Sequence, residues 1–193
     1  MISAILLAAG KSKRMGKENK LVKDLKGIPL IKHAVRGILD SSINELVVVL
    51  GYQEELVKKN IDTNKKIKFV YNKNFENGIS SSIKIGLENL SIETESFFIC
   101  LGDMPNISHN IYNKLINFQN NNEIVIPTYK GKRGNPILFS KSIKNILMEM
   151  KGDIGAKKII DKQNKKILEL ETNDKGVTQN FNTKDNFKIL KWL

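Results

Sequence analysis

Cysteine and histidine are scarce in this sequence of 193 residues. Its one cysteine, Cys100, excludes an internal disulfide framework and any zinc site built from several cysteines. Because Cys100 lies inside an apolar stretch, we expect it to be an inert residue of the core. The two histidines, His33 and His109, are far apart in the chain and do not have the spacing of a metal or catalytic pair.

Long hydrophobic runs are also absent. No stretch approaches the ~20 consecutive apolar residues that a membrane-spanning helix needs. The apolar N-terminal segment, 1–10, has no basic region before it and is only about as long as a strand, unlike a signal peptide. The sequence therefore predicts a cytoplasmic protein with no membrane partner.

Acidic and aromatic residues are few compared with basic ones. The chain has 32 Lys and Arg against 20 Asp and Glu, a net charge of +12, and only 7% aromatic residues. Such an excess favours anionic partners, which are nucleic acids, membrane surfaces or phosphorylated small molecules. However, the lysines are spread along the whole chain, and no alternation of aromatic and basic residues marks a platform for single strands. We therefore expect a solvated basic surface, and the pattern argues against nucleic acid.

The hydrophobic pattern predicts strands that alternate with helices. Short, mainly apolar runs predict strands at 2–7, 46–50, 67–71, 97–101, 124–126, 137–139 and 167–170. Apolar residues at helical spacing predict helices at 31–39, 54–61, 79–90, 111–118 and, capped by Ser140, through 148. Strands that are apolar on both faces indicate a parallel sheet with helices on each side. The expected fold class is α/β, a three-layer sandwich with a mainly parallel, Rossmann-like sheet.

The loop after the first predicted strand has the residues of a polyphosphate site. In open parallel sheets, ligands bind beyond the carboxyl ends of the strands. Small residues let backbone amides approach an anion there, and a hydroxyl and cations follow. The small residues are Ala8, Ala9 and Gly10, the hydroxyl is that of Ser12, and the cations are Lys11, Lys13, Arg14, Lys17 and Lys20. An ordinary basic surface loop remains an open alternative.

Two known glycine motifs do not fit this loop. A P-loop needs glycine where Ile5 stands, and Gly10 and Gly16 do not have the spacing of G-x-G-x-x-G.

Two further loops carry polar residues at the same predicted edge. Asp103 follows the strand at 97–101, where a carboxylate facing phosphates is suited to hold magnesium. Because Asp103 comes shortly before Pro105, a turn-initiating role stays open. The segment 77–82, N-G-I-S-S-S, leads into a predicted helix. Its glycine allows close backbone approach, and its serines either cap the helix or offer hydroxyls to a ligand.

Taken together, these motifs resemble the molybdenum cofactor cytidylyltransferases and guanylyltransferases, which belong to the pyrophosphorylase-like nucleotidyltransferases. The matching segments are L-A-A-G-x-S-x-R-M-G at 7–16, N-G-I-S-S-S at 77–82, L-G-D-M-P at 101–105, G-x-x-G-N-P-x-x-F at 131–139, G-D-x-G-A at 152–156 and N-F-N-T at 180–183. They occur in the family order and cover almost the whole chain. The resemblance implies a single NTP transferase domain, 1–193, with a nucleotide-binding half at 1–127 and an acceptor-binding half at 128–193.

The resemblance also implies the chemistry and its residues. A phosphate of the acceptor attacks the α-phosphate of a nucleoside triphosphate, with Mg²⁺ as cofactor, and pyrophosphate leaves. The implied catalytic residues are Arg14, Lys20 and Asp103. The implied nucleotide-binding residues are Leu7, Ala8, Ala9, Gly10, Ser12, Arg14, Lys20, Asn72, Gly78, Ser80 and Ser81. The implied acceptor-binding residues are Arg133, Gly134, Asn135, Pro136, Asp153 and Gly155, and the implied metal ligands are Asp103 and Asn182.

The choice of substrates rests on smaller differences. Ala8-Ala9-Gly10 matches the cytidylyl relatives, since guanylyl relatives tend to have Ala-Gly-Gly, so the resemblance favours CTP over GTP. The chain departs from many cytidylyl members at Asn135, where they have histidine, and at Asn180 and Asn182, where they have the aspartates of D-x-D-T. The hypothesis is CMP transfer to molybdopterin, a phosphorylated pterin. Guanylyl transfer, another phosphorylated acceptor and a weakly active cofactor-binding chaperone for a molybdoenzyme stay open.

Overall fold

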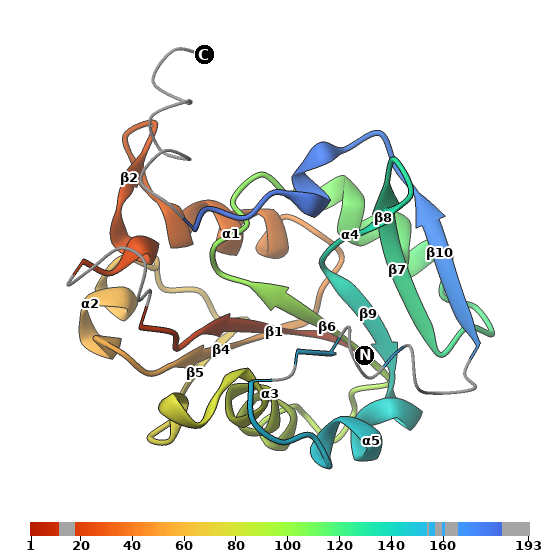
Figure 1. Cartoon of the computed structure of the whole chain (residues 1–193), viewed down its shortest axis with the longest axis horizontal. Helices are drawn as coiled ribbons and strands as arrows, with labels where there is room; N and C mark the ends of the chain where they lie inside the picture. Colours follow the sequence, from red (N-terminus) through yellow and green to blue (C-terminus); the bar gives the residue numbers. More distant parts are fainter. Residues whose placement is uncertain (12–17, 154, 157–159, 161–165, 183–193) are drawn as a thin grey trace.

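The computed structural model describes residues 1–11, 18–153, 155–156, 160 and 166–182. Its centre is an eight-stranded sheet in which seven strands follow the order β10-β7-β9-β6-β1-β4-β5 and β8 pairs with β7 (Figure 1). The strands are β1 (Ile2–Ala8), β4 (Glu45–Leu50), β5 (Ile67–Tyr71), β6 (Ser96–Leu101), β7 (Ile124–Tyr129), β8 (Lys132–Arg133), β9 (Ile137–Ser140) and β10 (Ile167–Glu171). The short strands β2 (Asp24–Leu25) and β3 (Ile28–Pro29) form a separate antiparallel ribbon.

Most neighbouring strands of the large sheet run parallel, as predicted. β1 lies between β4 and β6 and is parallel to both, β4 is parallel to β5, and β7 is parallel to β10. β9 runs antiparallel between β6 and β7, and β8 is antiparallel to β7. Because β9 is inserted between two earlier strands, residues of 1–127 and of 128–193 share one continuous sheet.

Helices cover both faces of the sheet. In Figure 1, α1 (Leu30–Leu39), α2 (Glu54–Lys59) and α4 (His109–Asn117) lie on one side, and α3 (Ile79–Glu88) and α5 (Lys144–Met148) lie on the other. Successive β1 residues alternate between the two cores, since Leu6 packs with the α1 side and Ile5 with the α3 side. The predicted α/β three-layer sandwich is therefore confirmed. Among the described residues, no helix is long and apolar enough to cross a membrane.

The helix predicted through residue 148 begins differently from the expectation. Ser140 caps a 3₁₀ turn, η4 (Lys141–Ile143), and accepts a hydrogen bond from the Ser142 amide at 3.2 Å. The α-helix α5 starts only after this turn. Ser140 therefore caps the 3₁₀ turn, and α5 follows this turn in the chain. Leu147 of α5 is buried against the sheet.

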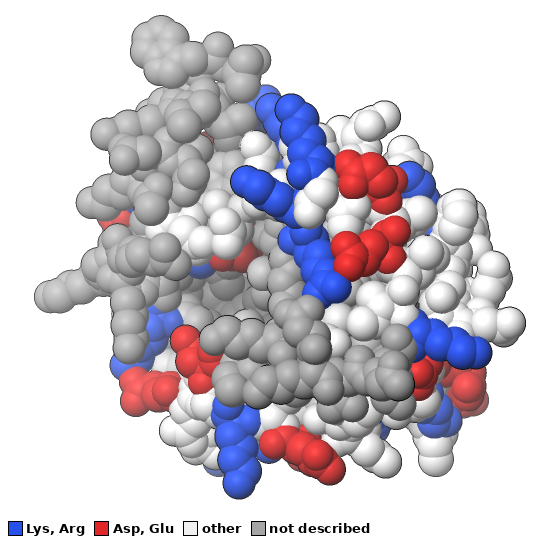
Figure 2. Space-filling view, turned by 45° about the vertical axis from the view of Figure 1, so that its right-hand side comes forward, with Lys and Arg blue, Asp and Glu red and all other residues white. Residues whose placement is uncertain are grey.

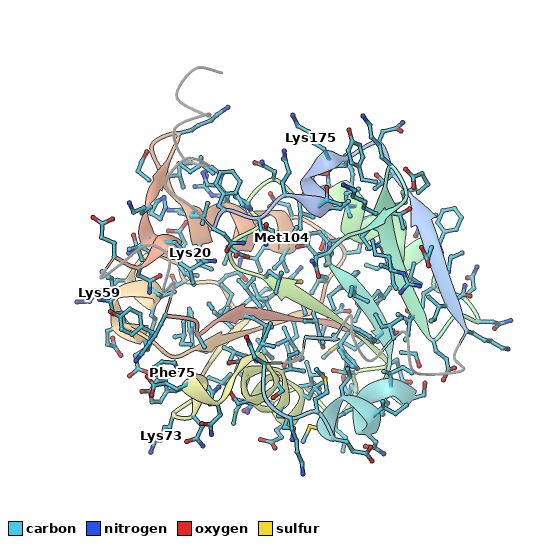
Figure 3. All side chains as sticks on the ribbon, viewed as in Figure 1. Lys20, Lys59, Lys73, Phe75, Met104 and Lys175 are labelled. Atoms are coloured by element: carbon cyan, nitrogen blue, oxygen red, sulfur yellow. The ribbon has the colours of Figure 1, made fainter. Side chains whose placement is uncertain are left out.

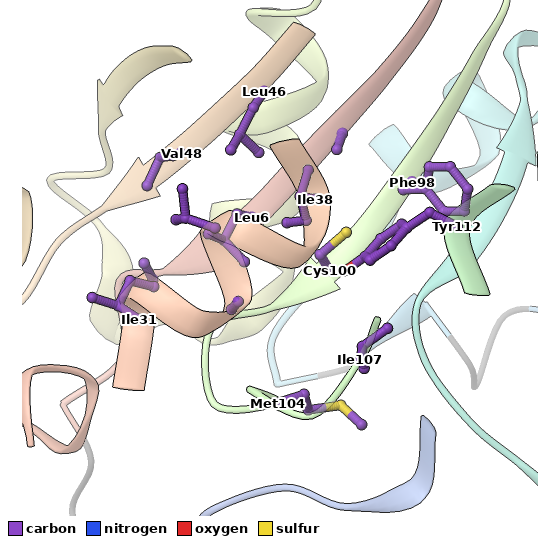
Figure 4. Close-up of a cluster of buried hydrophobic side chains, with 14 of the residues drawn as sticks. Leu6, Ile31, Ile38, Leu46, Val48, Phe98, Cys100, Met104, Ile107 and Tyr112 are labelled. Atoms are coloured by element: carbon purple, nitrogen blue, oxygen red, sulfur yellow. The ribbon is translucent and has the colours of Figure 1, made fainter. Parts of the chain in front are cut away.

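One core fills the space between the sheet, α1 and α4 (Figure 4). Apolar residues at helical spacing give α1 a buried face that includes Ile31 and Ile38. Phe98 of β6 meets Tyr112 of α4 edge to face, with ring centroids 5.3 Å apart. Cys100 lies in the same cluster and is almost fully buried, as expected from the sequence. The strands β1, β4 and β6 thus pack against a buried apolar core.

Basic and acidic side chains are interspersed on the face shown in Figure 2. Several lysines have carboxylate partners there or elsewhere on the surface: Lys32 contacts Asp62 at 2.7 Å, and Lys23 contacts Glu18 at 2.6 Å. Exposed pairs of this kind contribute little to stability.

The loop at 134–136 packs against η5 (Lys175–Thr178), a 3₁₀ turn near the end of the described chain. The Asn135 amide donates to the Val177 carbonyl oxygen at 2.8 Å, and Val177 is fully buried. A β-carbon on Gly134 would lie 2.4 Å from that same oxygen, so only glycine fits there. The turn η5 in turn leads to residues 180–182.

Replacing Gly134 by alanine should therefore destabilise the protein. The added methyl group forces Val177 and its turn to move, and we expect a loss of about 1–3 kcal/mol in the free energy of unfolding. Urea unfolding followed by circular dichroism measures this loss. Gly155→Ala is the matched control, because a β-carbon there meets no atom of the described residues within 4 Å. Equal stability of the two variants would contradict the proposed packing.

The single cysteine gives a second test of the fold. Burial raises the pKa of the Cys100 thiol from 9.0 to about 12, since the charged thiolate loses its hydration, and a hydrogen bond with Tyr112 opposes this only in part. A rise of that size lowers the thiolate fraction at pH 8 about 1000-fold. We expect iodoacetamide to leave the folded protein unmodified and to alkylate it rapidly in urea. Rapid alkylation without denaturant would show that the core around β6 is open.

Candidate active site

A cavity of about 1000 Å³ opens at the carboxyl ends of β1 and β6. Lys20 and Phe75 lie on the side of the molecule toward which these two strands point (Figure 3). The described lining residues are 7–11, 20–21, 75–79, 82, 101, 103, 153, 180 and 182. They come from segments that are far apart in the sequence.

The pairing of β1 with β6 brings the first loop and Asp103 together. The two strands are parallel, and Leu7 stands opposite Leu101 in their register. The Gly102 amide continues this pairing by donating to the Leu7 carbonyl oxygen at 3.1 Å. Asp103 therefore follows the end of β6 close to Ala8, at the end of β1. This agrees with the expectation that the carboxyl ends of parallel strands meet at one edge of the sheet.

Lys20 connects the two predicted metal ligands. Its Nζ donates to Asp103 Oδ2 at 2.5 Å and to Asn182 Oδ1 at 2.7 Å. The side chains of Lys20 and Asp103 are only 16% and 14% exposed, so water screens this pair weakly. Charge-assisted hydrogen bonds of this kind are stronger than neutral ones. The three residues form a compact polar group on one side of the cavity.

Backbone contacts hold each member of this group in place. Lys20 opens the 3₁₀ turn η2 (Lys20–Val22), whose N-terminus is capped by Asn19: its Oδ1 accepts from the Leu21 amide at 3.1 Å. The buried Phe181 donates its amide hydrogen to the Asp103 carbonyl oxygen at 2.9 Å. Asn182 is thereby placed directly beside Asp103.

The opposite side of the cavity is formed where α3 begins. Gly78 has φ +97°, and a β-carbon there would lie 2.5 Å from the Gly152 carbonyl carbon. Ser80 Oγ donates to the Gly152 carbonyl oxygen at 2.6 Å, and the Ile79 amide donates to Asp153 Oδ1 at 3.3 Å. The loop at 152–153 therefore caps the start of α3. It brings Gly78, predicted to bind nucleotide, into contact with the segment predicted to bind the acceptor.

Three predicted nucleotide-binding residues do not line the cavity. They make hydrogen bonds that hold the segment around Gly78. Asn72 is almost fully buried, and its Nδ2 donates to the hydroxyls of Ser81 and Ser82 at 2.9 and 3.0 Å. Ser81 Oγ donates to the Gly78 carbonyl oxygen at 2.8 Å, and Ser80 is bonded to Gly152. These polar groups fix the shape of the loop around Gly78.

The structure therefore brings together only part of the predicted site. The predicted residues that line the cavity are Leu7, Ala8, Ala9, Gly10, Lys20, Gly78, Asp103, Asp153 and Asn182. Ser12 and Arg14 lie outside the described residues.

Most of the predicted acceptor residues lie elsewhere. Within the described chain, Arg133, Gly134, Asn135, Pro136 and Gly155 are not among the lining residues. Arg133 is bonded to Glu169 at 2.7 Å, because β8 and β10 flank β7 and place the two side chains together. Gly134 and Asn135 contact η5, so their observed contacts position the segment that carries Asn182.

The cavity also contains residues that the sequence motifs did not identify. Phe75 lies in the turn η3 (Phe75–Asn77), beside Tyr52, with ring centroids 6.5 Å apart. The Lys11 ammonium stands 5.8 Å from the centre of the Phe75 ring and forms an ion pair with Glu76. Phe75 and Glu76 stand directly before the N-G-I-S-S-S segment, and this position was the signal that could have identified them. Lys11 is one of the cations that the sequence placed in the first loop. The aromatic ring gives this end of the cavity an apolar surface.

Asp103 and Asn182 have the chemistry of a magnesium site. One carboxylate oxygen and one amide oxygen converge on a single position, which the ammonium of Lys20 fills. Both are hard oxygen ligands, and Mg²⁺ in phosphate-binding sites often takes only one or two protein ligands. In the described part of the chain, no group of three or more His, Cys, Asp and Glu could hold a metal. A magnesium ion here would depend on these two oxygens together with substrate phosphates.

Comparisons with known proteins agree with this geometry. The molybdenum cofactor cytidylyltransferase of Escherichia coli is 29% identical over 147 residues, which are 72% of this chain and 70% of that protein. The bifunctional protein GlmU of Staphylococcus epidermidis is 24% identical over 74% of this chain, but the match spans only 31% of GlmU.

Solved structures show the same fold. Rv0371c of Mycobacterium tuberculosis aligns with a TM-score of 0.86 at 22% identity, covering 98% of this chain and 96% of that one. A further structure of Rv0371c, with a TM-score of 0.82, is a complex with manganese.

The family assignment follows from the sequence match and agrees with the site. The model of the MobA-like NTP transferase domain matches residues 4–167, which include the first loop, Gly78, Asp103 and Asp153. The resemblance inferred from the motifs is thereby confirmed. By its sequence, this chain belongs to the MobA-like NTP transferase domain family and is a nucleotidyltransferase.

Proposed function

We propose that this protein transfers CMP from CTP to the phosphate of molybdopterin in the molybdenum cofactor and releases pyrophosphate. The observation that carries the proposal is the Lys20 ammonium, held between Asp103 and Asn182 beside the loop at 7–11. A cation and a pair of magnesium ligands next to a small-residue loop form a site for a metal-bound polyphosphate. The name of the similar E. coli enzyme and the Ala8-Ala9-Gly10 segment support the base and the acceptor.

The reaction needs positioning more than proton transfer. An oxygen of the acceptor phosphate attacks the α-phosphorus of CTP, a new P–O bond forms, and the bond to the β-phosphate breaks with loss of pyrophosphate. A phosphate monoester is already ionised near neutral pH, so no general base has to activate it. That the described lining residues include no histidine is consistent with this chemistry.

Each side of the cavity has a role in this proposal. Ala8, Ala9 and Gly10 allow the backbone to approach the triphosphate closely. Lys20 offsets the negative charge that shifts toward the leaving pyrophosphate. Asp103 and Asn182 would hold Mg²⁺, which when bound neutralises phosphate charge.

The remaining residues orient the two substrates. Gly78 and Phe75 form the wall on which ribose and base would rest, and Asp153 borders the acceptor side. Arg14 remains a proposed cation for the phosphates. Arg133 is bonded to Glu169, so a direct contact with the acceptor would require that pair to open.

A panel of nucleotides and acceptors tests the proposal directly. The purified protein is incubated with Mg²⁺, one of the four ribonucleoside triphosphates and either molybdenum cofactor or a phosphorylated sugar or alcohol, and pyrophosphate release is measured. We expect release with CTP and molybdenum cofactor. Faster release with GTP would overturn the choice of base. Release only with a sugar or alcohol phosphate would overturn the acceptor, and no release in any combination would favour a binding role.

The metal ligands make a separate prediction. Asp103→Ala should lower turnover by on the order of 10²-fold or more, since the site loses its carboxylate. Asn182→Asp should stay active and reach half its maximal rate at a lower magnesium concentration, because a second carboxylate attracts a divalent cation more strongly. Magnesium titrations of the pyrophosphate-release rate measure both effects.

Asn180→Asp is the matched control for this experiment. It makes the same chemical change two residues away, on the same cavity, but the hydrogen bond from the Lys20 ammonium goes to Asn182. We expect its magnesium requirement to stay within about twofold of the parent protein. An equal shift in both variants would assign the effect to general charge rather than to ligation by Asn182.

A further inference from the structure

We infer that Lys20 occupies the cation position of the nucleotide-free protein and excludes divalent metal until a nucleotide draws it away. The inference rests on the proposed function, because it concerns the same two ligands. It adds a second role to Lys20: this lysine couples metal binding to nucleotide binding.

The two oxygens cannot serve the lysine and a metal ion at once. Lys20 Nζ stands 2.5 Å from Asp103 Oδ2 and 2.7 Å from Asn182 Oδ1. Magnesium ligated by these oxygens at its usual ~2.0–2.1 Å would lie against the ammonium, in contact with a like charge. Lys20 and the metal therefore compete for one position.

Without a bound nucleotide, the charges at the site favour Lys20 over a divalent cation. The ammonium neutralises the Asp103 carboxylate, and both side chains are largely shielded from water. Magnesium gives up its hydration shell reluctantly, so the displacement of a bonded ammonium adds a second obstacle. The protein without nucleotide should consequently bind divalent cations weakly.

A triphosphate reverses this balance. Lys20 and the loop at 7–11 line the same cavity, so the ammonium can bond to phosphate without leaving it. Asp103 and Asn182 are then available to the cation that accompanies the nucleotide. Because coupling of two ligands is reciprocal, metal and nucleotide each strengthen the binding of the other.

Manganese binding without nucleotide tests the inference independently of activity. The free Mn²⁺ signal in electron paramagnetic resonance is followed while the apo protein is titrated. We expect weak binding by the parent protein and binding about tenfold tighter or more by Lys20→Met, which removes the competing charge. Lys20→Gln, which keeps a hydrogen-bond donor but has no charge, should also gain affinity, and circular dichroism verifies that both variants fold.

Lys11→Met is the matched control. Lys11 lines the same cavity, but its ammonium is paired with Glu76, so its removal should leave manganese affinity within about twofold of the parent. The double variant Lys20→Met with Asp103→Asn should lose the gained affinity, because the site loses its carboxylate.

The outcomes separate this inference from the proposed function. If folded Lys20→Met and Lys20→Gln bind manganese no more tightly than the parent, or if the gain survives Asp103→Asn, the inference is wrong. An equal gain in Lys11→Met would also overturn it, since the effect would then be general charge. Absence of pyrophosphate release by the parent protein would reject the proposed function, and the comparison of manganese affinities would be unchanged by that result.

Discussion

The parallel pairing of β1 with β6 is the constraint on which the rest of this site depends. Backbone hydrogen bonds set Leu7 opposite Leu101 and extend to Gly102, so the chain leaves both strands at one edge. A small-residue loop and a carboxylate thereby become neighbours although they lie far apart in the sequence. Shifting this register by one residue would turn the alternating side chains of β1 to the wrong cores. Core packing and site geometry are thus fixed by the same pairing.

The later part of the chain completes the site from outside the parallel strands. β9 enters the sheet between β6 and β7, and Asp153, Asn180 and Asn182 of the following segments line the cavity. The loop at 152–153 caps α3 beside Gly78, while η5 carries the chain to Asn182. Nucleotide-side and acceptor-side segments therefore share hydrogen bonds.

Both described lysines of the site are paired with carboxylates, despite the basic composition of the whole chain. Lys20 is neutralised by Asp103 and Lys11 by Glu76, both within the cavity. In such a cavity, the phosphates of a polyphosphate would pair with the lysines, and its cation would pair with the carboxylates. The charges that lose a partner thereby gain another, so the electrostatic cost is modest. This property underlies both the proposed transfer reaction and the proposed competition between Lys20 and metal. The asparagine at position 182 fits it, since one carboxylate matches one ammonium.

The sequence by itself determined the order of the main strands and helices, because uninterrupted apolar runs and helical spacing are local properties of the chain. It also determined the family, through short motifs whose spacing is visible without a structure, and the placement of Lys20, Gly78, Asp103 and Asn182 on one cavity agrees with them. Only the tertiary structure decided which polar side chains face that cavity. Asn72 and Arg133 have residue types suited to ligands, yet they are bonded to Ser81 and Glu169. Partners of this kind are set by how distant segments pack, which local sequence does not encode.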